Sequence, residues 1–320
     1  MYLRTTTTAT NNTMLGYIMT NQSTYNELSA QASTQKKLNT PSDNATDAIS
    51  VLNINKSLSQ LNGYLGNMSQ SQNELNMLDT SLASITKTLQ RANDLTVQAA
   101  TGTNSAATLG NIKIEIDQII KTLQGLGNAQ FNGSYIFAGT NVGTVPFQEN
   151  TVDGGVTYVG TPQTDDYERY IQISQGVETA INVPGDKLLG FYDADATGTP
   201  PVPTGSGIFK TLYELSAALG TTPTTPASFD AIRSKLTGIQ DGITNISSVR
   251  TNFASITNRF NMTATSIQNN IVQLKSFKSG MEDVDLATTM SNLSQQELAL
   301  KATMAVASQS MKSASLLDYI

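Results

Sequence analysis

The 320-residue chain contains no histidine, no cysteine and no tryptophan. Without histidine or cysteine it can form neither a Ser-His-Asp nor a Cys-His nucleophile pair, and it cannot build the usual zinc site of nitrogen and sulfur ligands. Without cysteine it also has no disulfide that would need an oxidising compartment. Since only carboxylate, lysine and tyrosine chemistry remains, we predict that the protein is not an enzyme and that it holds no cofactor or metal.

Long apolar runs are also missing. No window approaches the roughly 20 consecutive apolar residues that a membrane-spanning helix needs. The first residues, MYLRTTTTATNNT, are polar after a single arginine, whereas a cleaved secretory signal has a continuous apolar centre. We therefore expect no membrane insertion and no cleaved signal peptide.

Charge is sparse and unevenly placed. Residues 141–200 hold nine of the 25 acidic residues but two of the 19 basic ones, and the net charge is −6. Because the chain has no basic cluster, we expect no nucleic-acid partner. Asp165, Asp166 and Glu168 could be imagined as a metal or acid/base cluster, but no further ligand accompanies them, so the pattern favours a solvated acidic loop.

Helical periodicity dominates the first part of the chain. From about Met14 to Leu126, Leu, Ile and Met recur three and four residues apart, which is the spacing of one helix face. A breaker cluster at residues 101–105 predicts a turn between two antiparallel helices. The clearest apolar stripes are Leu58, Leu61, Leu65, Met68, Leu75, Leu78, Leu82, Ile85 and Leu89, and then Leu109, Ile112, Ile116, Ile119, Leu123 and Leu126.

A β-rich segment interrupts the helices from residue 131 to about residue 191, where Phe, Tyr and Gly are frequent. The runs 156–159, 167–173 and 179–183 predict strands, and in the second run apolar and polar residues alternate as in a half-buried strand. A Pro/Gly-rich linker is expected at residues 196–206.

Helical sequence returns from Ile208, with a loop at residues 220–226, a helix from Ser228 to about Phe277 and a break at Gly280. Helices therefore bracket the β segment on both sides. The predicted fold is mainly α with a small inserted β domain, in which the N- and C-terminal halves pair in a long antiparallel helical rod.

The two ends of the chain carry heptad patterns typical of coiled coils. Neither seam can be buried within its own helix, so each terminal helix needs a partner. We predict that the ends pack against each other and against neighbouring copies, and that they become ordered on assembly. The expected assembly residues are Leu286, Met290, Leu293, Leu300, Met304, Met311, Leu316 and Leu317 in the C-terminal helix, and Met14, Ile18, Tyr25 and Leu28 in the N-terminal helix.

Three motifs add to the periodic pattern. The first, KKLNTPSDNA, contains Lys37, Asn39, Pro41, Ser42 and Asp43 and predicts a turn in which Ser42 or Asp43 accepts N–H groups of the next helix. The second, FNGSYIFAGT, opens the β segment and contains Asn132, Gly133, Tyr135, Phe137 and Gly139. The third is the tail, with VDLA, LSQQEL and the final SLLDYI.

These motifs lie at the start, middle and end of the chain, and together they resemble the flagellin superfamily. Asn44 departs from the second Asp that is commoner in the first motif. The second motif favours the hook-associated branch of the hook–filament junction over flagellin itself. The resemblance implies three domains: terminal helices of an inner tube (1–40 and 281–320), a helical rod (41–140 and 206–280) and a β-rich outer domain (141–205).

The resemblance also implies a structural subunit of the bacterial flagellum that connects hook to filament by helical self-assembly through its terminal helices. Its implied partners are copies of itself, an adjacent hook-associated protein on the hook side, flagellin on the filament side and an export chaperone for the C-terminal helix. Its implied location is extracellular, after export by the flagellar type III apparatus. Two alternatives stay open: a flagellin filament subunit, and a secreted adhesin with a helical stalk.

Overall fold

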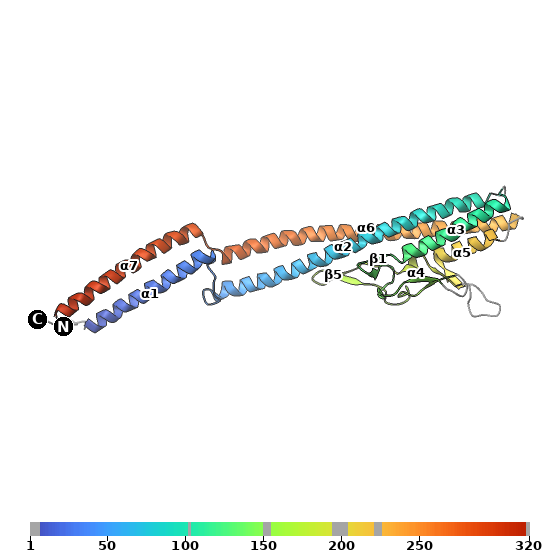
Figure 1. Ribbon diagram of the computed structural model, residues 1–320. Helices are drawn as coiled ribbons and strands as arrows, with labels where there is room; N and C mark the ends of the chain where they lie inside the picture. Colours follow the sequence, from blue (N-terminus) through green and yellow to red (C-terminus); the bar gives the residue numbers. More distant parts are fainter. Residues whose placement is uncertain (1–6, 102–103, 150–154, 194–203, 221–225, 318–320) are drawn as a thin grey trace. The chain divides into compact units, whose positions relative to one another are not determined.

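The computed structural model describes residues 7–101, 104–149, 155–193, 204–220 and 226–317 (Figure 1). The chain forms two compact units, one made of Met1–Leu61 with Gln268–Ile320 and the other of Asn62–Ile267. The two longest helices, α2 (Ala45–Ala99) and α6 (Pro226–Glu282), contribute to both units. The expected fold class, mainly helical with a small β insert between N- and C-terminal helical halves, is confirmed.

A helical bundle forms the larger part of the second unit. In this unit α2 and α6 run antiparallel, and α3 (Ala106–Gly127) packs against α5 (Gly207–Gly220). Their apolar residues are spaced at heptad intervals, so each helix keeps one continuous stripe turned toward its neighbours. The buried stripe of α6 is Ile232, Ile239, Ile246, Phe253, Phe260 and Ile267, and that of α2 includes Met68, Leu75, Leu78, Leu82, Ile85 and Leu89.

The turn between α2 and α3 forms where the breaker cluster predicts it. Ser105 caps α3 by accepting a hydrogen bond from the Thr108 backbone N–H (3.2 Å). The Asn104 amide donates to the Gln98 and Thr101 carbonyl oxygens (2.6 and 2.9 Å), which closes the end of α2. Residues 102–103 lie outside the described part of the chain.

The β insert consists of short antiparallel strands in three small sheets. β1 (Gln130–Phe131) pairs with β2 (Ser134–Tyr135), and β5 (Tyr170–Ser174) pairs with β6 (Val177–Ala180). The third sheet has the order β3-β4-β7-β8, with all neighbours antiparallel. Its strands are β3 (Phe147–Glu149), β4 (Val156–Tyr158), β7 (Phe191–Asp193) and β8 (Thr204–Ser206), and the short helix α4 (Gly185–Leu188) precedes β7.

The three predicted strands form in the β insert, but some of their boundaries differ from the prediction. β4 lies within the predicted run 156–159, whereas β5 begins three residues into the run 167–173 and ends one residue beyond it, at Ser174. β5 exposes Tyr170 while burying Ile173. β6 starts earlier and ends at Ala180, because the residues after it turn inward to reach α4. The end of the predicted 196–206 linker is β8, which pairs with β7; residues 196–203 of that linker, like residues 221–225 of the later loop, lie outside the described residues.

The predicted helix break at Gly280 is wrong. Gly280 lies within α6, which continues to Glu282. A glycine inside a helix costs only about 1 kcal/mol relative to alanine, so one glycine does not end a long helix. The helix stops instead where the backbone of residues 282–284 bonds to residues 35–37.

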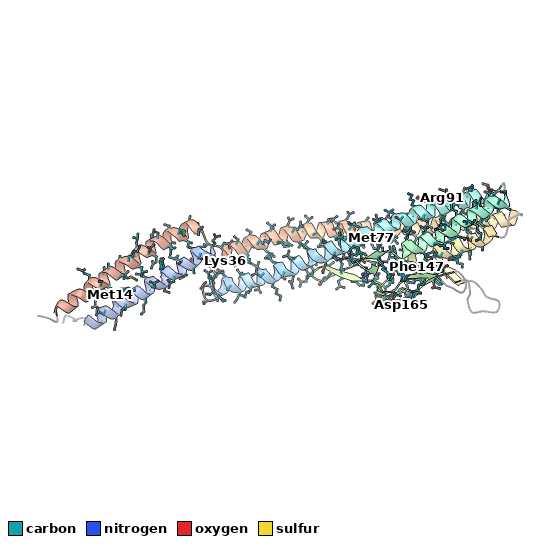
Figure 2. The ribbon with its side chains drawn as sticks, viewed as in Figure 1. Met14, Lys36, Met77, Arg91, Phe147 and Asp165 are labelled. Carbon is teal, nitrogen blue, oxygen red and sulfur yellow. The ribbon has the colours of Figure 1, made fainter. Side chains whose placement is uncertain are left out.

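Phe147 connects the insert to the bundle. A Cβ atom on Gly127, at the end of α3, would lie 2.6 Å from the Phe147 ring, and one on Gly185 would lie equally close. The buried Phe147 ring, labelled in Figure 2, also contacts Phe209 of α5 and Tyr158 of β4. The centroid distances are 5.4 and 5.3 Å. Glycine at these two positions therefore makes room for the ring.

Because the bundle is held by buried leucines, truncating one should be costly. Leu82→Ala, at a fully buried position, is expected to lower the free energy of unfolding by about 2–5 kcal/mol in urea titrations followed by circular dichroism. Leu52→Ala in the same helix is the matched control, since that side chain is 65% exposed, and should change it by less than about 0.5 kcal/mol. Equal effects of the two variants would contradict this assignment of the core.

Candidate assembly site

The terminal helices α1 (Thr7–Thr34) and α7 (Leu286–Leu317) pack side by side and antiparallel within the first unit (Figure 1). Each turns a face with spacings of three and four residues toward the other, as in a coiled coil. The α1 face is Met14, Ile18, Asn21, Tyr25, Leu28 and Ala32, all half-buried (Figure 2 labels Met14). The α7 face is Thr289, Leu293, Gln296, Leu300, Thr303 and Ala307, of which Thr289, Leu300 and Ala307 are buried.

The C-terminal residues predicted to form one seam lie on two stripes. Leu293 and Leu300 face α1, whereas Leu286, Met290 and Met304 are 43, 53 and 46% exposed. The side chains of Met311, Leu316 and Leu317 lie outside the described residues. The predicted N-terminal residues Met14, Ile18, Tyr25 and Leu28 all face α7.

Polar residues take the positions that the predicted seam assigned to methionines. The Asn21 amide donates to the Thr303 hydroxyl (2.8 Å), and the Gln296 amide donates to the Asn21 side-chain oxygen (3.1 Å). Because these groups satisfy one another, they can lie between two helices without an unpaired donor. The sequence analysis missed Thr289, Gln296 and Thr303 because it followed apolar residues alone. The seven-residue spacing of these three polar residues was the available signal.

Apolar side chains remain exposed on other faces of the same pair. Leu286, Met290 and Met304 flank the Leu293–Leu300 stripe on the side away from the polar residues. Leu298 and Val306, 65 and 54% exposed, lie near the opposite side of α7. On α1 the exposed apolar residues are Leu15, Tyr17 and Met19. Such clusters of exposed apolar side chains mark interaction surfaces.

The linkers at one end of the helix pair are joined to each other. The Lys37 backbone N–H donates to the Glu282 carbonyl (2.8 Å), and the Val284 N–H donates to the Gln35 carbonyl (3.1 Å). Lys36, which forms a β-bridge with Asp283, also makes an ion pair with the Glu282 carboxylate. We call residues 35–37 and 282–284 the linker clamp.

The KKLNTPSDNA turn is built differently from the prediction. Asp43 accepts hydrogen bonds from the Thr40 hydroxyl and from the backbone N–H groups of Thr40 and Asn39 (2.6, 2.8 and 2.9 Å), and these bonds, the hydroxyl first, lower the pKa of Asp43. Asn44, and neither Ser42 nor Asp43, caps α2, since its side-chain oxygen accepts from the N–H groups of Thr46 and Asp47. Pro41 and Ser42 are the central residues of the turn closed by the Asp43 N–H and the Thr40 carbonyl.

The motif that opens the β segment shapes the fold of the insert. Asn132 and Gly133 both have positive φ (50° and 81°), as a two-residue hairpin turn between β1 and β2 requires. Tyr135 pairs within this hairpin, and its N–H donates to the Val142 carbonyl. Phe137 is buried and its carbonyl accepts from the Tyr158 hydroxyl (2.8 Å). Gly139 has φ +68° and lies against Thr161. These contacts are internal to the insert.

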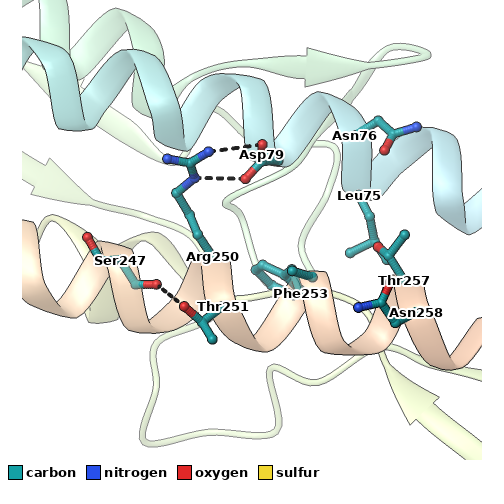
Figure 3. A pocket seen from close by; sticks show the side chains of 10 residues that line it. Leu75, Asn76, Asp79, Ser247, Arg250, Thr251, Phe253, Thr257 and Asn258 are labelled. Atoms are coloured by element: carbon teal, nitrogen blue, oxygen red, sulfur yellow. Dashed lines mark hydrogen bonds and ion pairs between the residues drawn. The ribbon is translucent and has the colours of Figure 1, made fainter.

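Figure 3 shows a hollow of about 580 Å³ between α2 and α6 within the second unit. Its charged groups are already paired, because the Arg250 guanidinium donates to both Asp79 carboxylate oxygens (2.7 and 3.1 Å). Asp165 and Asp166 are exposed, as expected of a solvated loop (Figure 2 labels Asp165). The described residues contain no group of three acidic side chains able to hold a metal, and none of the described helices is apolar and long enough to span a membrane.

Comparison with known proteins decides the family. The family model for the bacterial flagellin N-terminal helical region matches residues 5–142, and the model for the bacterial flagellin C-terminal helical region matches residues 236–320. Together the two models span more than half of the chain. The chain belongs to the flagellin family. Its resemblance to that superfamily, expected from the three motifs, is thereby confirmed, and as a flagellin-family chain it is a structural flagellar component.

Relatives within the flagellin family carry two names. The chain is 27% identical to flagellin of Bacillus subtilis strain 168 over 272 residues, 82% of each chain. It is 24% identical to flagellar hook-associated protein 3 of Escherichia coli K12 over 294 residues, 89% of this chain and 90% of that one. The crystal structure of Bacillus cereus FlgL is similar with a TM-score of 0.53 and 26% identity, over 72% of this chain and all of the other.

The linker clamp of this flagellin-family chain contains a titratable group with a predictable response. The hydrogen bond from Lys36 and the charges of Lys278 and Lys36 lower the pKa of Glu282 below its ordinary value of 4.5, against the opposing effect of burial. A lowered carboxyl pKa stabilises the fold above 4.5, and this stabilisation is lost as the pH falls through the folded pKa.

Lys36→Ala is therefore expected to move the Glu282 titration midpoint up toward 4.5, measured by carbon NMR of the carboxyl group. Lys301→Ala is the control, because Lys301 pairs with Glu297. A midpoint that stays in place in the Lys36 variant would show that the ion pair does not set the Glu282 pKa.

Proposed function

We propose that the chain is a structural subunit that connects the flagellar hook to the filament, and that it is not an enzyme. The observation that carries the proposal is the arrangement of apolar side chains on α7. One stripe is covered by α1, while Leu286, Met290 and Met304 on one side and Leu298 and Val306 on the other remain exposed. A terminal helix with several apolar faces fits packing among several neighbours.

The energetics of the α1–α7 pair favour assembly with further copies. Most of its facing residues are half-buried, and three of the six on α7 are polar. Ordering each residue costs roughly 1–2 kcal/mol of backbone entropy, whereas burying a large apolar side chain returns about 1.5–3 kcal/mol. Burial within the α1–α7 pair alone therefore offsets little of this entropy cost. Identical copies that meet through different faces make heterologous contacts, which continue as an open helix when the rotation between copies does not close a ring.

The junction role is favoured by the structural likeness to FlgL. In Legionella pneumophila the protein of that name is described as a flagellar junction protein; its structure is 13% identical to this chain, with a TM-score of 0.58. The FNGSYIFAGT motif, whose hydrogen bonds and packing organise the β insert, is the sequence feature that favours the hook-associated branch in this proposal.

A flagellin filament subunit is the second candidate, supported by the identity to Bacillus subtilis flagellin. The two roles differ in what purified chain forms. A filament subunit grows long filaments alone, and a junction subunit does not. The adhesin alternative has no comparable support.

The junction role implies partners and a route. The subunit contacts its own copies, a hook-associated protein on the hook side and flagellin on the filament side, and a chaperone holds the C-terminal helix before export through the type III apparatus. The three-domain division (1–40 and 281–320, 41–140 and 206–280, 141–205) is part of the same proposal. In it the terminal helices form the inner tube.

Met304→Asp should block incorporation into flagella while leaving the chain folded, because a charge on the exposed apolar stripe opposes its burial against a neighbour. The measurement is recovery of the variant in purified flagella and motility of a strain that carries only this copy. Asn292→Asp is the matched control, because Asn292 is an exposed polar position of the same helix with polar neighbours one turn before and after it, and this variant should assemble normally. Normal incorporation of Met304→Asp would exclude this stripe from the contact.

Leu300→Asp, which acts on the stripe facing α1, should also abolish incorporation. The two variants test different contacts, since only Leu300→Asp removes a side chain that is buried within the chain itself. The second unit, Asn62–Ile267, should stay folded in both variants. Loss of its cooperative unfolding would point to misfolding as the cause.

Limited proteolysis of purified monomer tests whether the ends order on assembly. Loss of about 30 to 45 residues from each end, with a protected core identified by mass spectrometry, is the expected outcome. In assembled flagella the same sites should be protected. Ends that resist protease in the monomer would mean that α1 and α7 satisfy each other without neighbours.

A further inference from the structure

The interface between α1 and α7 repeats every seven residues on the α7 side. Thr289, Gln296 and Thr303 form a polar repeat, and Leu293, Leu300 and Ala307 form an apolar one. A shift of α7 by one heptad brings Gln296 to the place of Thr303 and Thr289 to the place of Gln296. Asn21 would then still meet two polar side chains, so the interface itself distinguishes poorly between registers one heptad apart.

The length of the connections does not fix the register either. One heptad corresponds to about 10 Å along a helix. The ten residues between α1 and α2, 35–44, can span roughly 33 Å when extended. The three residues between α6 and α7 are short, but α1 can move along α7 through the longer connection.

We propose that the linker clamp sets the register of α1 against α7. Its two backbone hydrogen bonds, from Lys37 to Glu282 and from Val284 to Gln35, lie next to the end of α1 at Thr34 and the start of α7 at Leu286. The Lys36 ion pair with Glu282 and the Lys37 ammonium bond to the Gly280 carbonyl (3.1 Å) reinforce them. With one end pinned, each α7 position has a single partner on α1.

The clamp also accounts for residues of the KKLNTPSDNA motif. Lys36 and Lys37 form the clamp, and the turn closed by Asp43 holds the chain that leads from it to α2. The consequence for assembly rests on the proposed function, since a helical array needs every copy to present Met290 and Met304 at the same height beside α1. The register itself is a property of one chain.

Cross-linking of the full chain tests the clamp, and the lack of native cysteine makes introduced thiols unambiguous. Ile18→Cys with Ala307→Cys reports the observed register, because both side chains line one small hollow. Ile18→Cys with Leu300→Cys reports a shift of one heptad. A short thiol-specific bifunctional reagent traps the pair even where it opens and closes, and the ratio of the two yields measures register.

The clamp variant is Lys37→Pro with Val284→Pro, because proline lacks the N–H that each bond requires. The residues before them, Lys36 and Asp283, form the β-bridge, and extended backbone is compatible with a following proline. The matched control, Lys37→Ala with Val284→Ala, keeps both donors. The ratio should fall about tenfold in the proline variant and by less than about twofold in the control, since both variants lose the exposed Lys37 ammonium bond to Gly280 but only the proline variant loses the backbone donors.

A milder variant covers the case in which the prolines unfold the chain. Lys36→Ala removes the ion pair alone and should lower the ratio about twofold. A ratio in the proline variant that stays within twofold of the wild-type value, whatever the total yield, overturns the proposal. So does the absence of both cross-links in the otherwise unmodified chain.

Incorporation into flagella is scored separately from register. If the proline variant is incorporated into flagella and its cross-linking ratio is unchanged, the proposed role of the linker clamp is overturned and the junction role still stands. If the wild-type chain itself is not incorporated into flagella, the junction role is overturned. The cross-linking ratio then still reports the effect of the linker clamp on register.

Discussion

Heptad spacing of apolar residues is the constraint on which the rest of this structure depends. Along α6 of the second unit the buried positions recur every seven residues, from Ile232 to Ile267, and along α2 they recur every three and four. Helices that keep one stripe over so many turns must lie alongside partners with the same spacing. The β insert and the α3–α5 pair are positioned against stripes that already exist.

The same spacing gives different results in the two units. In the bundle most heptad positions are leucine, isoleucine and phenylalanine, and nearly all of these are fully buried. In the α1–α7 pair half of the α7 positions are threonine or glutamine, and two of them, Gln296 and Thr303, make hydrogen bonds with Asn21. A polar interface contributes less per residue than a dry core, because each hydrogen bond replaces one to water. The bundle buries its apolar residues within one chain, whereas the α1–α7 pair is suited to further packing against other chains.

The sequence predicted the long helices, the turn before Ser105 and strand β5 because periodicity and breaker residues report them directly. It misplaced the helix end at Gly280, since the stop depends on a backbone contact with residues 35–37 that no local pattern shows. It identified Leu293 and Leu300 on the facing stripe but merged them with Met290 and Met304, because a seven-residue repeat does not say which side meets the partner. The cap of α2 is Asn44 because the Asp43 carboxylate is already occupied by the turn before it.

The seating of Phe147 has a consequence for how the insert can vary. Its ring touches Gly127, where the chain leaves the bundle, and Phe209, just after the chain returns to it. The point where the chain leaves the bundle and the point where it returns thus both lie beside one side chain. A segment whose two ends already meet can be lengthened, shortened or exchanged for another domain without rethreading the helices. We therefore expect residues 128–206 to tolerate replacement as a unit, with the packing of the helical bundle unchanged.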